Sequence, residues 1–340
     1  IIIFIPFLYG KKIHIITTND LHGVIAPQKA YFMNPNFPPE ILGFAAYYDY
    51  VQSLKEELES KGEGLLILDG GNFFQGNPIG LVDGGKSVIE WMNLIGYDAI
   101  TLGPNDFILG TDNLLELSKL ADFPILASNI NLENTAPYII KNIHGVKIAI
   151  IGIVSSNLRE LVLDHNLNSM KIEKEIPKLS KMVETVKLMG ADIIIALSSN
   201  GIPWDREEEY EKFINNISDF KPKEAIINAL ELGYFAENID LMVVGGNSKG
   251  YPELWYDKTS HVYLTQNYGN GTEFGHLILE TENNKLINIS SAVSGRIGQT
   301  LLADNFTSDV EILTLLKDLE SRALSNLSSQ NYVYNQTMQS

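Results

Sequence analysis

The feature that most constrains this chain is a regular alternation of short β-branched runs with amphipathic helical stretches. Six runs are predicted to be buried strands: Lys12–Thr18, Gly64–Leu68, Asp98–Leu102, Lys147–Val154, Asp192–Leu197 and Asp240–Val244. Four stretches between them carry apolar residues at helical spacing: Tyr48–Ser60, Lys86–Leu94, Asp112–Leu120 and Lys178–Met189. This alternation predicts an α/β protein with mainly parallel neighbouring strands and right-handed crossovers.

The pattern changes after about Tyr256. Three runs there are predicted to be antiparallel strands that complete a sheet: His261–Gln266, Phe274–Thr281 and Lys285–Ile289. A helix is predicted over Val310–Leu324, and a polar tail rich in Ser, Asn and Gln follows it. With 340 residues, of which 45% are hydrophobic and 20% charged, the chain has the size and composition of a soluble globular protein with a large core.

The N-terminal segment and the overall charge limit location and partners. Residues Ile1–Tyr9 are almost entirely apolar and precede Gly10 and a Lys pair, which predicts that residues 1–10 are the remnant of a signal peptide. We therefore expect a secreted or periplasmic protein of the cell envelope, without a transmembrane span in the mature chain. A net charge of −17 excludes nucleic acid as the main partner, and the lack of cysteine excludes disulfides and thiolate ligands.

Polar, glycine-containing clusters directly follow five of the predicted strands. In chain order they are Asn19–Gly23, Asp69–Asn72, Gly103–Asp106, Ser198–Gly201 and Gly245–Lys249. Loops at the carboxyl ends of strands converge on the functional crevice of an α/β sheet. Ordinary turns would account for any one of these clusters but poorly for all five, so together they predict a functional site.

These five clusters, in this order, resemble the metallophosphoesterase motifs of the 5'-nucleotidase and UDP-sugar hydrolase family. The resemblance extends from about Lys12 to Asp318 and includes three flanking segments: Gln75–Pro78, Phe123–Asn129 and Gln266–Gly269. It implies a calcineurin-like fold, a four-layer α/β/β/α sandwich with mixed sheets, over residues 11–307. Residues 308–340 are then expected to form a connecting helix and polar tail, without the C-terminal nucleoside-binding domain of the family.

The chemistry that the resemblance implies is two-metal hydrolysis of a phosphoester, with a carboxylate bridging two divalent cations. Two of eight family positions are kept, namely Asp20 and His22, candidate ligands of the first metal. The bridging carboxylate falls at Asn72, whose neutral amide bridges two cations poorly. Asp69, in the same cluster, is retained but is not the bridging residue in the family.

The other family positions are also substituted. The ligand amide falls at Pro104, and the catalytic histidine falls at Asn105, with Asp106 beside it in a helper position. Three ligand histidines fall at Ser199, Asn247 and Lys249. The remaining histidines match no family ligand and are expected to be structural or surface residues; they are His14, His144, His165, His261 and His276.

Lys249 is the most informative of these substitutions. It occupies the position of a ligand to the metal that Asp20 and His22 would hold, so an ammonium group replaces a cation ligand. A buried carboxylate is costly without a partner, and we therefore predict an Asp20–Lys249 ion pair that takes the place of the metal.

The six substitutions predict a non-catalytic member of the family, a binding or structural protein of the cell envelope. No cofactor is expected, and the partner would be a protein or a small anionic ligand held by Lys249 and loop amides. The alternative is a phosphohydrolase of 5'-nucleotidase type that acts on nucleotides with a reduced Mn²⁺, Zn²⁺ or Mg²⁺ site on Asp20, His22 and Asn72. A third possibility is an assembly component, which an exposed apolar patch away from the strand-end loops would favour.

Overall fold

The computed structural model of the chain describes residues 10–222, 225–293 and 295–329. All six strands predicted in the first part of the chain are present, and so are the four predicted helices. The predicted signal-peptide remnant, apart from Gly10, and the end of the polar tail lie outside the described residues.

The first sheet is built around the N-terminal strand. Its strands, in spatial order, are β14 (Lys285–Ser291), β13 (Glu273–Glu282), β1 (Lys11–Thr18), β4 (Gly64–Asp69), β5 (Ala99–Thr101) and β6 (Ile125–Leu126), with β15 (Gly298–Thr300) paired to β13. The four strands from β1 to β6 run parallel. The late strands β13 and β14 pair antiparallel and complete the sheet, as predicted, and β15, which was not predicted, also pairs antiparallel to β13.

The second sheet has the order β11 (Trp255–Tyr256), β12 (Tyr263–Thr265), β10 (Leu241–Val244), β9 (Ile193–Ser198), β8 (Val146–Ile153) and β7 (Tyr138–Ile143). The prediction that His261–Gln266 is antiparallel is wrong for its main pairing, because β12 runs parallel to β10 and antiparallel only to the two-residue β11. The loop between β10 and β12 returns to the end of the sheet at which β10 begins. β12 therefore runs in the same direction as β10.

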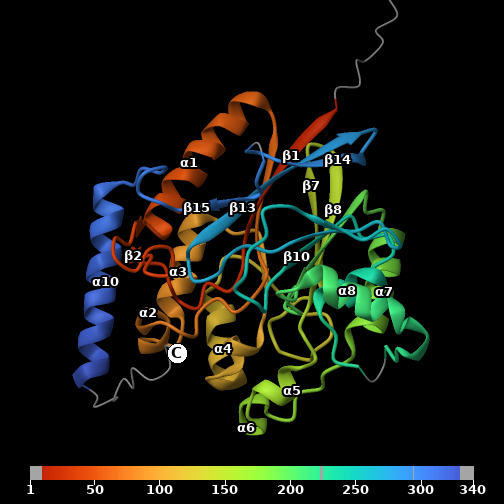
Figure 1. The fold of residues 1–340 in the computed structure, drawn as a ribbon, viewed down its shortest axis with the longest axis horizontal. Helices are drawn as coiled ribbons and strands as arrows, with labels where there is room; N and C mark the ends of the chain where they lie inside the picture. Colours follow the sequence, from red (N-terminus) through yellow and green to blue (C-terminus); the bar gives the residue numbers. More distant parts are fainter. Residues whose placement is uncertain (1–9, 223–224, 294, 330–340) are drawn as a thin grey trace, which may run out of the picture.

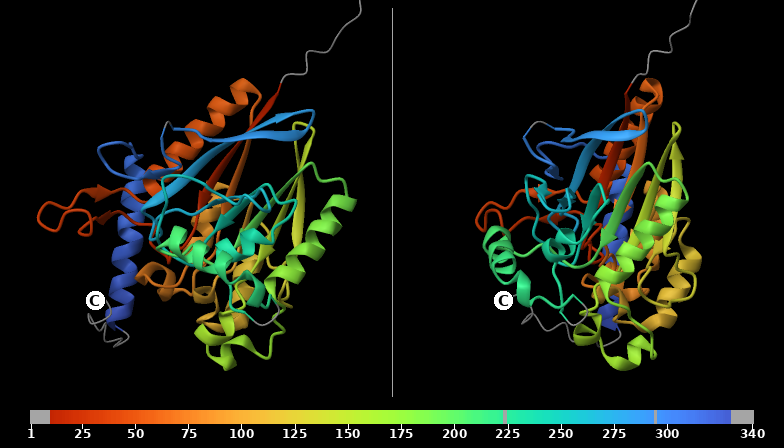
Figure 2. Two further views of the ribbon diagram at one scale, coloured as in Figure 1. Left: turned by 45° about the vertical axis from the view of Figure 1, so that its right-hand side comes forward. Right: turned by 90° about the vertical axis from the view of Figure 1, so that its right-hand side faces the viewer.

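The two sheets pack face to face, and helices cover both outer faces, as the predicted four-layer sandwich requires (Figures 1 and 2). The helices over the first sheet are α1 (Phe44–Lys61), α2 (Pro78–Val82), α3 (Lys86–Ile95), α4 (Gly110–Leu120) and α10 (Val310–Ser329). Over the second sheet lie α7 (Glu175–Leu188), α8 (Arg206–Asn215) and α9 (Ala229–Tyr234), while α5 (Leu158–Leu161) and α6 (Asp164–Leu167) follow β8.

The alternation of side chains along a strand explains how each strand contributes apolar residues to both faces of its sheet. Ile13 and Ile15 belong to the apolar layer between the sheets, together with Ile148 and Ile195 of the second sheet. Ile16 instead joins the layer beneath the helices. Because successive side chains of a strand point to opposite faces, a continuous apolar run is what a strand buried on both faces requires.

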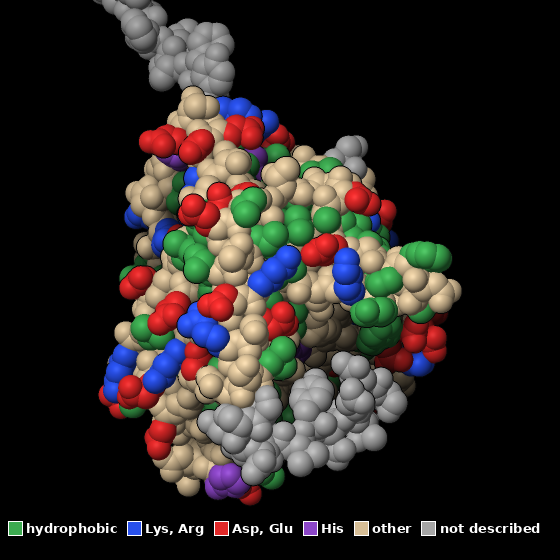
Figure 3. Space-filling view, turned by 90° about the vertical axis from the view of Figure 1, so that its left-hand side faces the viewer, with side chains coloured by type: hydrophobic (Ala, Val, Ile, Leu, Met, Phe, Trp, Pro, Cys, Tyr) green, Lys and Arg blue, Asp and Glu red, His purple; other side chains and the backbone are tan. Residues whose placement is uncertain are grey.

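A short two-stranded sheet projects from this sandwich. It consists of β2 (Gln28–Lys29) and β3 (Glu40–Ile41), which are antiparallel and joined by residues 30–39. The red hairpin extends away from the body in the left panel of Figure 2, and hydrophobic side chains gather on the projection at the right of Figure 3.

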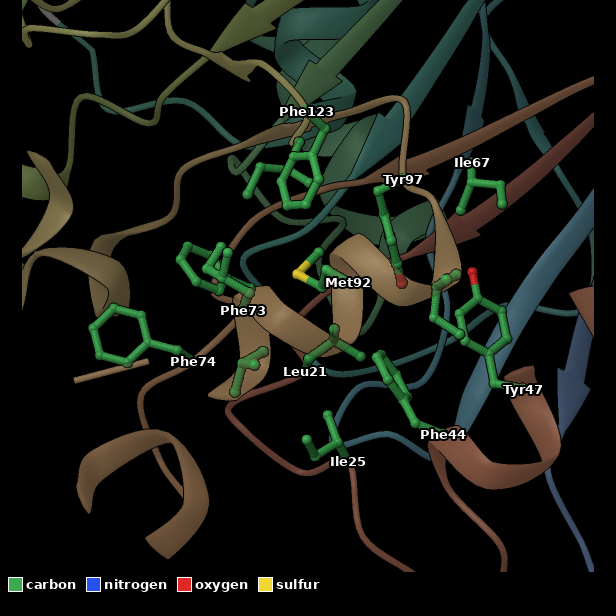
Figure 4. Close-up of a cluster of buried hydrophobic side chains, with 14 of the residues drawn as sticks. Leu21, Ile25, Phe44, Tyr47, Ile67, Phe73, Phe74, Met92, Tyr97 and Phe123 are labelled. Carbon is green, nitrogen blue, oxygen red and sulfur yellow. The ribbon is translucent and has the colours of Figure 1, made fainter. Parts of the chain in front are cut away.

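The core beneath α1 and α3 anchors the loops that leave the first sheet (Figure 4). Leu21 and Phe73, which come from the loops after β1 and β4, are buried among the side chains of Phe44, Tyr47 and Met92. Each of these loops also carries a polar residue of the predicted site next to its buried anchor. Apolar burial on the helix side therefore holds the polar side chains at the ends of the strands.

Candidate functional site

The five polar clusters converge at the carboxyl ends of the parallel strands, as predicted. They line a cleft of about 130 Å³ formed by Asp20, His22, Asn72, Pro104, Asn105, Asn157, Leu161, Ser199, Asn200, Gly246, Asn247 and Ser248. Asp20, His22 and Asn72 all have positive φ, at 49°, 51° and 61°. Asp, Asn and His adopt this left-handed backbone more readily than other non-glycine residues, and it directs these three side chains from tight turns at the strand ends.

Asp20 is buried, and neutral N–H groups surround its carboxylate. Oδ1 accepts hydrogen bonds from Asn72 Nδ2 at 2.7 Å and from the Gly246 amide at 3.0 Å. Oδ2 accepts from Asn19 Nδ2 at 2.9 Å and from the same Gly246 amide at 3.0 Å. Charge-assisted hydrogen bonds of this kind stabilise a buried carboxylate without a cation.

Lys249 does not form the predicted ion pair with Asp20. Its Nζ donates a hydrogen bond to the Trp204 carbonyl at 2.7 Å. The same ammonium lies over the rings of Trp204 and Tyr251, at 4.8 and 5.0 Å from their centroids. Amide donors already satisfy Asp20. Lys249 instead makes cation–π contacts with Trp204 and Tyr251.

His22 keeps an orientation that suits a ligand. Its Nδ1 lies 2.9 Å from the Gln75 carbonyl, and because a carbonyl only accepts, we place the ring proton on this nitrogen. Nε2 then carries the lone pair and lies 3.9 Å from Asp20 Oδ1. The Asn105 amide nitrogen lies 3.3 Å from Nδ1, where the catalytic histidine of the family was expected.

The side chain of Asn72, at the position of the bridging carboxylate in the family, is held by hydrogen bonds at both its nitrogen and its oxygen. Its amide nitrogen donates to Asp20, and its Oδ1 accepts from the Asn105 backbone amide at 3.0 Å. A Cβ atom at Gly103 would lie only 2.1 Å from this oxygen, so a larger residue there would displace the Asn72 side chain. Pro104, which begins the short 3₁₀ helix Pro104–Phe107, offers no side-chain donor or acceptor.

Asp106 and Asp69 are buried behind the cleft and support its backbone. Asp106 accepts hydrogen bonds from the amides of Gly103, Asn72 and Phe73, each at 2.8 Å, and burial raises its pKa to about 7. Asp69 accepts from Thr18 Oγ1 at 2.6 Å, and burial raises its pKa well above the usual range. Both carboxyl groups position loops, which agrees with the helper role expected of Asp106.

The remaining substituted positions make local polar contacts. Ser199 Oγ accepts from the Ser155 amide at 3.0 Å, and Asn247 Nδ2 donates to the Ile202 carbonyl at 3.0 Å. Asn247 Oδ1 also accepts from the Lys249 amide at 3.3 Å. These contacts satisfy neutral side chains with protein groups where the family resemblance implies histidine ligands.

The sequence prediction missed one wall of the cleft. Asn157 lines the cleft, and its Oδ1 is buried without a hydrogen-bond partner among the described residues. Behind it, the buried carboxylate of Glu175 accepts from Asn200 Nδ2 at 3.1 Å and from the Ser156 amide. A signal was present, because Ser155–Asn157 is a sixth polar cluster directly after a strand, although it lacks glycine.

The side chains present do not fit a dinuclear metal centre. Among the described residues, no group of three or more His, Asp or Glu side chains is arranged so that it could hold a metal ion. Asp20 and His22 are the ionisable groups that line the cleft. Two cations would require a bridging anion and several further ligands, whereas the other side chains that line this cleft are amides, hydroxyls, a proline and a leucine.

Comparison with known proteins identifies relatives that are phosphoesterases. No family model matches the chain. A 5'-nucleotidase of Vibrio parahaemolyticus is 24% identical over 340 residues, which cover 93% of this chain and 58% of the relative. A 2',3'-cyclic-nucleotide 2'-phosphodiesterase/3'-nucleotidase of Haemophilus influenzae is 27% identical over 289 residues, covering 74% of this chain and 42% of the relative. The chain thus spans about half the length of these curated relatives.

Solved structures share the fold. The 5'-nucleotidase precursor of Thermus thermophilus superposes with a TM-score of 0.71 at 17% identity, over 94% of this chain and 59% of that protein. The calcineurin-like phosphoesterase YfkN of Bacillus subtilis superposes with a TM-score of 0.69 at 22% identity, over 94% of this chain and 100% of that structure. The predicted calcineurin-like sandwich is confirmed.

Proposed function

We propose that this chain, which belongs to the 5'-nucleotidase-like family of calcineurin-like metallophosphoesterases, is a non-catalytic member that acts as a binding or structural protein. The observation that carries the proposal is the environment of Asp20. Four hydrogen bonds from three neutral N–H groups reach its two oxygens. A cation bound by Asp20 would have to displace some of these hydrogen bonds.

The substitutions support the proposal together rather than singly. A bridging site needs an anion between two cations, and Asn72 offers a neutral amide whose nitrogen faces Asp20. Asn105 cannot transfer a proton to a leaving group, which is the role of the family histidine. No cofactor is part of the proposed function.

The cleft favours an uncharged polar ligand over the anion expected from the sequence. An anion would meet the Asp20 carboxylate, while Lys249 is engaged by Trp204 and the Gly246 amide by Asp20. Amide and hydroxyl groups line the remaining surface and can both donate and accept hydrogen bonds. We therefore propose a small polar ligand, or a protein partner that covers the cleft.

A secreted or periplasmic location in the cell envelope remains our proposal for the protein. It rests on the apolar and basic residues at the start of the sequence. Among the described residues, no helix combines the length and apolar character needed to cross a membrane.

An active phosphohydrolase with a reduced site is the second candidate, and one observation favours it. His22 holds its Nδ1 proton against a backbone carbonyl and leaves Nε2 near Asp20, as metal-binding histidines do. The relatives named above are nucleotidases and phosphodiesterases. In this case one divalent ion would be bound by Asp20 and His22, with Asn72 turned so that its oxygen faces the ion.

Metal content and nucleotide hydrolysis distinguish the two candidates. The chain is equilibrated with Mn²⁺ and Zn²⁺, bound metal is measured by elemental analysis, and hydrolysis of a nucleoside 5'-monophosphate is assayed. A matched variant restores the family ligands and catalytic histidine, with Asn72→Asp, Pro104→Asn, Asn105→His, Ser199→His, Asn247→His and Lys249→His. We expect near-zero metal and no hydrolysis for the natural chain, with metal bound by the restored variant.

Other outcomes would reject the proposal. One metal per chain, with hydrolysis that Asp20→Ala abolishes, would establish the reduced site. Two metals per chain in the natural sequence would mean that the substituted side chains still assemble a dinuclear centre.

A further inference from the structure

The loop between β2 and β3 presents large apolar side chains to solvent. We call Tyr31, Phe32, Met33 and Phe37 the apolar tip; their exposed fractions are 63%, 69%, 49% and 82%. No charged residue occurs in residues 30–39. The nearest charges are Lys29 and Glu40, which face each other at the base with Nζ and Oε2 3.4 Å apart.

Hydrogen bonds within the loop hold the apolar tip in one shape. The Ala30 amide donates to the Pro39 carbonyl at 2.9 Å, which closes the loop above the strands. Asn34 Oδ1 accepts from the amides of Asn36 and Phe37 at 3.1 and 3.0 Å, and this turn sets the direction of the Phe37 backbone. The apolar tip is therefore preorganised for contact.

The base of the hairpin is tied to the body of the protein. Ile41 is fully buried and pairs with Leu302 through an isolated β-bridge. Gln28 Nε2 donates to the Asn270 carbonyl at 2.7 Å. These attachments hold the hairpin in its projecting position, where hydrophobic side chains gather on the outer surface (Figures 2 and 3).

The size and chemistry of the apolar tip select its partner. Aromatic side chains offer roughly 150–250 Å² each, so the exposed fractions amount to on the order of 500 Å². A stable protein interface buries about 800 Å² on each partner, which the apolar tip does not reach by itself. A convex, uncharged aromatic surface does suit a lipid headgroup layer, where aromatic rings are enriched and no matching groove is needed.

We propose that the apolar tip inserts into the interfacial layer of a zwitterionic phospholipid bilayer and attaches the protein to that surface without spanning it. An anionic bilayer would repel a chain with a net charge of −17, and the apolar tip offers no basic residue to offset the repulsion. The proposal is independent of the state of the cleft, because it rests on the hairpin alone.

Co-sedimentation with phosphatidylcholine vesicles at physiological salt tests the proposal. The full 340-residue chain is compared with the double variant Phe32→Ser/Phe37→Ser and with a matched control, Leu163→Ser/Leu188→Ser, whose leucines lie outside the hairpin and are 66% and 90% exposed. We expect the tip variant to lose at least about tenfold in vesicle partitioning, since two large apolar groups no longer leave water. The control should bind as the natural chain does.

A site-specific label provides a second readout. The chain has no cysteine, so Phe37→Cys and Leu163→Cys each create a single site for an environment-sensitive fluorophore. The emission should rise and shift to the blue on vesicle addition at position 37 and stay constant at position 163.

Several results would overturn the proposal. They are absence of binding to phosphatidylcholine vesicles, equal binding of the tip variant, and binding that requires anionic lipid. A dimer in sedimentation velocity that the tip substitutions dissociate would instead assign the apolar tip to a second copy of the chain. Matching unfolding transitions of all variants would exclude misfolding as the cause of a loss.

Discussion

The cleft and the underside of α1 satisfy buried ionisable groups in different ways. In the cleft, neutral N–H donors surround the Asp20 carboxylate. Under α1, Tyr50, His276, His14 and Glu63 bind one another in what we call the histidine chain. Its contacts are Tyr50 Oη to His276 Nδ1 at 2.6 Å, His276 Nε2 to His14 Nδ1 at 2.8 Å, and His14 Nε2 to Glu63 Oε2 at 3.1 Å.

The two regions depend on protonation in different ways: the histidine chain takes up protons on imidazoles, while behind the cleft burial raises the pKa of the Asp106 carboxyl to about 7. The histidine chain is fully paired with both imidazoles neutral, and protonation of both rings would set the N–H donors of His276 Nε2 and His14 Nδ1 against each other. Burial lowers the pKa of His276 to about 3, and the nearby His14 acts in the same direction. Burial also lowers the pKa of His14, against the opposing effect of Glu63. The hydrogen bonds to Asp20 come from amides, which do not titrate in this range.

The largest effect is expected at Asp106, which supports the cleft. Asp106→Ala removes an acceptor that three backbone amides share and leaves them buried without partners. We expect the free energy of unfolding to fall by about 3 kcal/mol in urea denaturation at pH 7. Asp122→Ala, at an exposed position, is the control and should change it little. A loss below about 1 kcal/mol at Asp106 would mean that water replaces the carboxylate.

The next largest effect concerns the pH dependence of the histidine chain. In the unfolded chain His276 has its ordinary pKa of 6.5, while in the folded chain the pKa is about 3. Between these values the unfolded state binds the extra proton, so stability is present above pH 6.5 and decreases as the pH falls. We expect His276 to account for a loss of about 2 kcal/mol between pH 7 and pH 5, while Asp106, whose pKa is about 7 in the folded chain, takes up its proton over the same range and acts in the opposite direction.

Urea denaturation at the two pH values checks this expectation. His276→Gln should be less stable at pH 7 but should show a smaller loss on acidification, since the buried imidazole is gone. His165→Gln is the matched control, because His165 is exposed. An unchanged pH dependence in His276→Gln would show that other titrating groups dominate the acid response.

The smallest effect is expected at Lys249, where the sequence prediction of an ion pair failed. Lys249→Met removes one hydrogen bond and two cation–π contacts at the rim of the cleft. The free energy of unfolding should fall by less than about 1 kcal/mol, with little change in its salt dependence. Exposed Lys258→Met serves as the control. A loss of about 3 kcal/mol or more would indicate that Lys249 compensates the buried Asp20 after all.

Local patterns were sufficient for the central strands, for most of the long helices and for the place of the cleft, but β7 and α8 were not predicted. Continuous apolar runs predicted the parallel strands, and polar clusters at their ends predicted which loops meet. The direction of β12 could not be predicted in this way, because a three-residue strand has the same side-chain pattern in either direction. The path of the preceding loop decides it.

For the site, the sequence by itself determined which side-chain types stand at the five clusters, and the identity of a side chain decides whether it can bind a cation. Only the tertiary structure decided how Asp20 is satisfied. The sequence predicted Lys249 as the compensating charge. In the structure the amides of Asn19, Asn72 and Gly246 bind the carboxylate instead. Hydrogen bonds act over about 3 Å, so their partners depend on how loops distant in sequence are packed together.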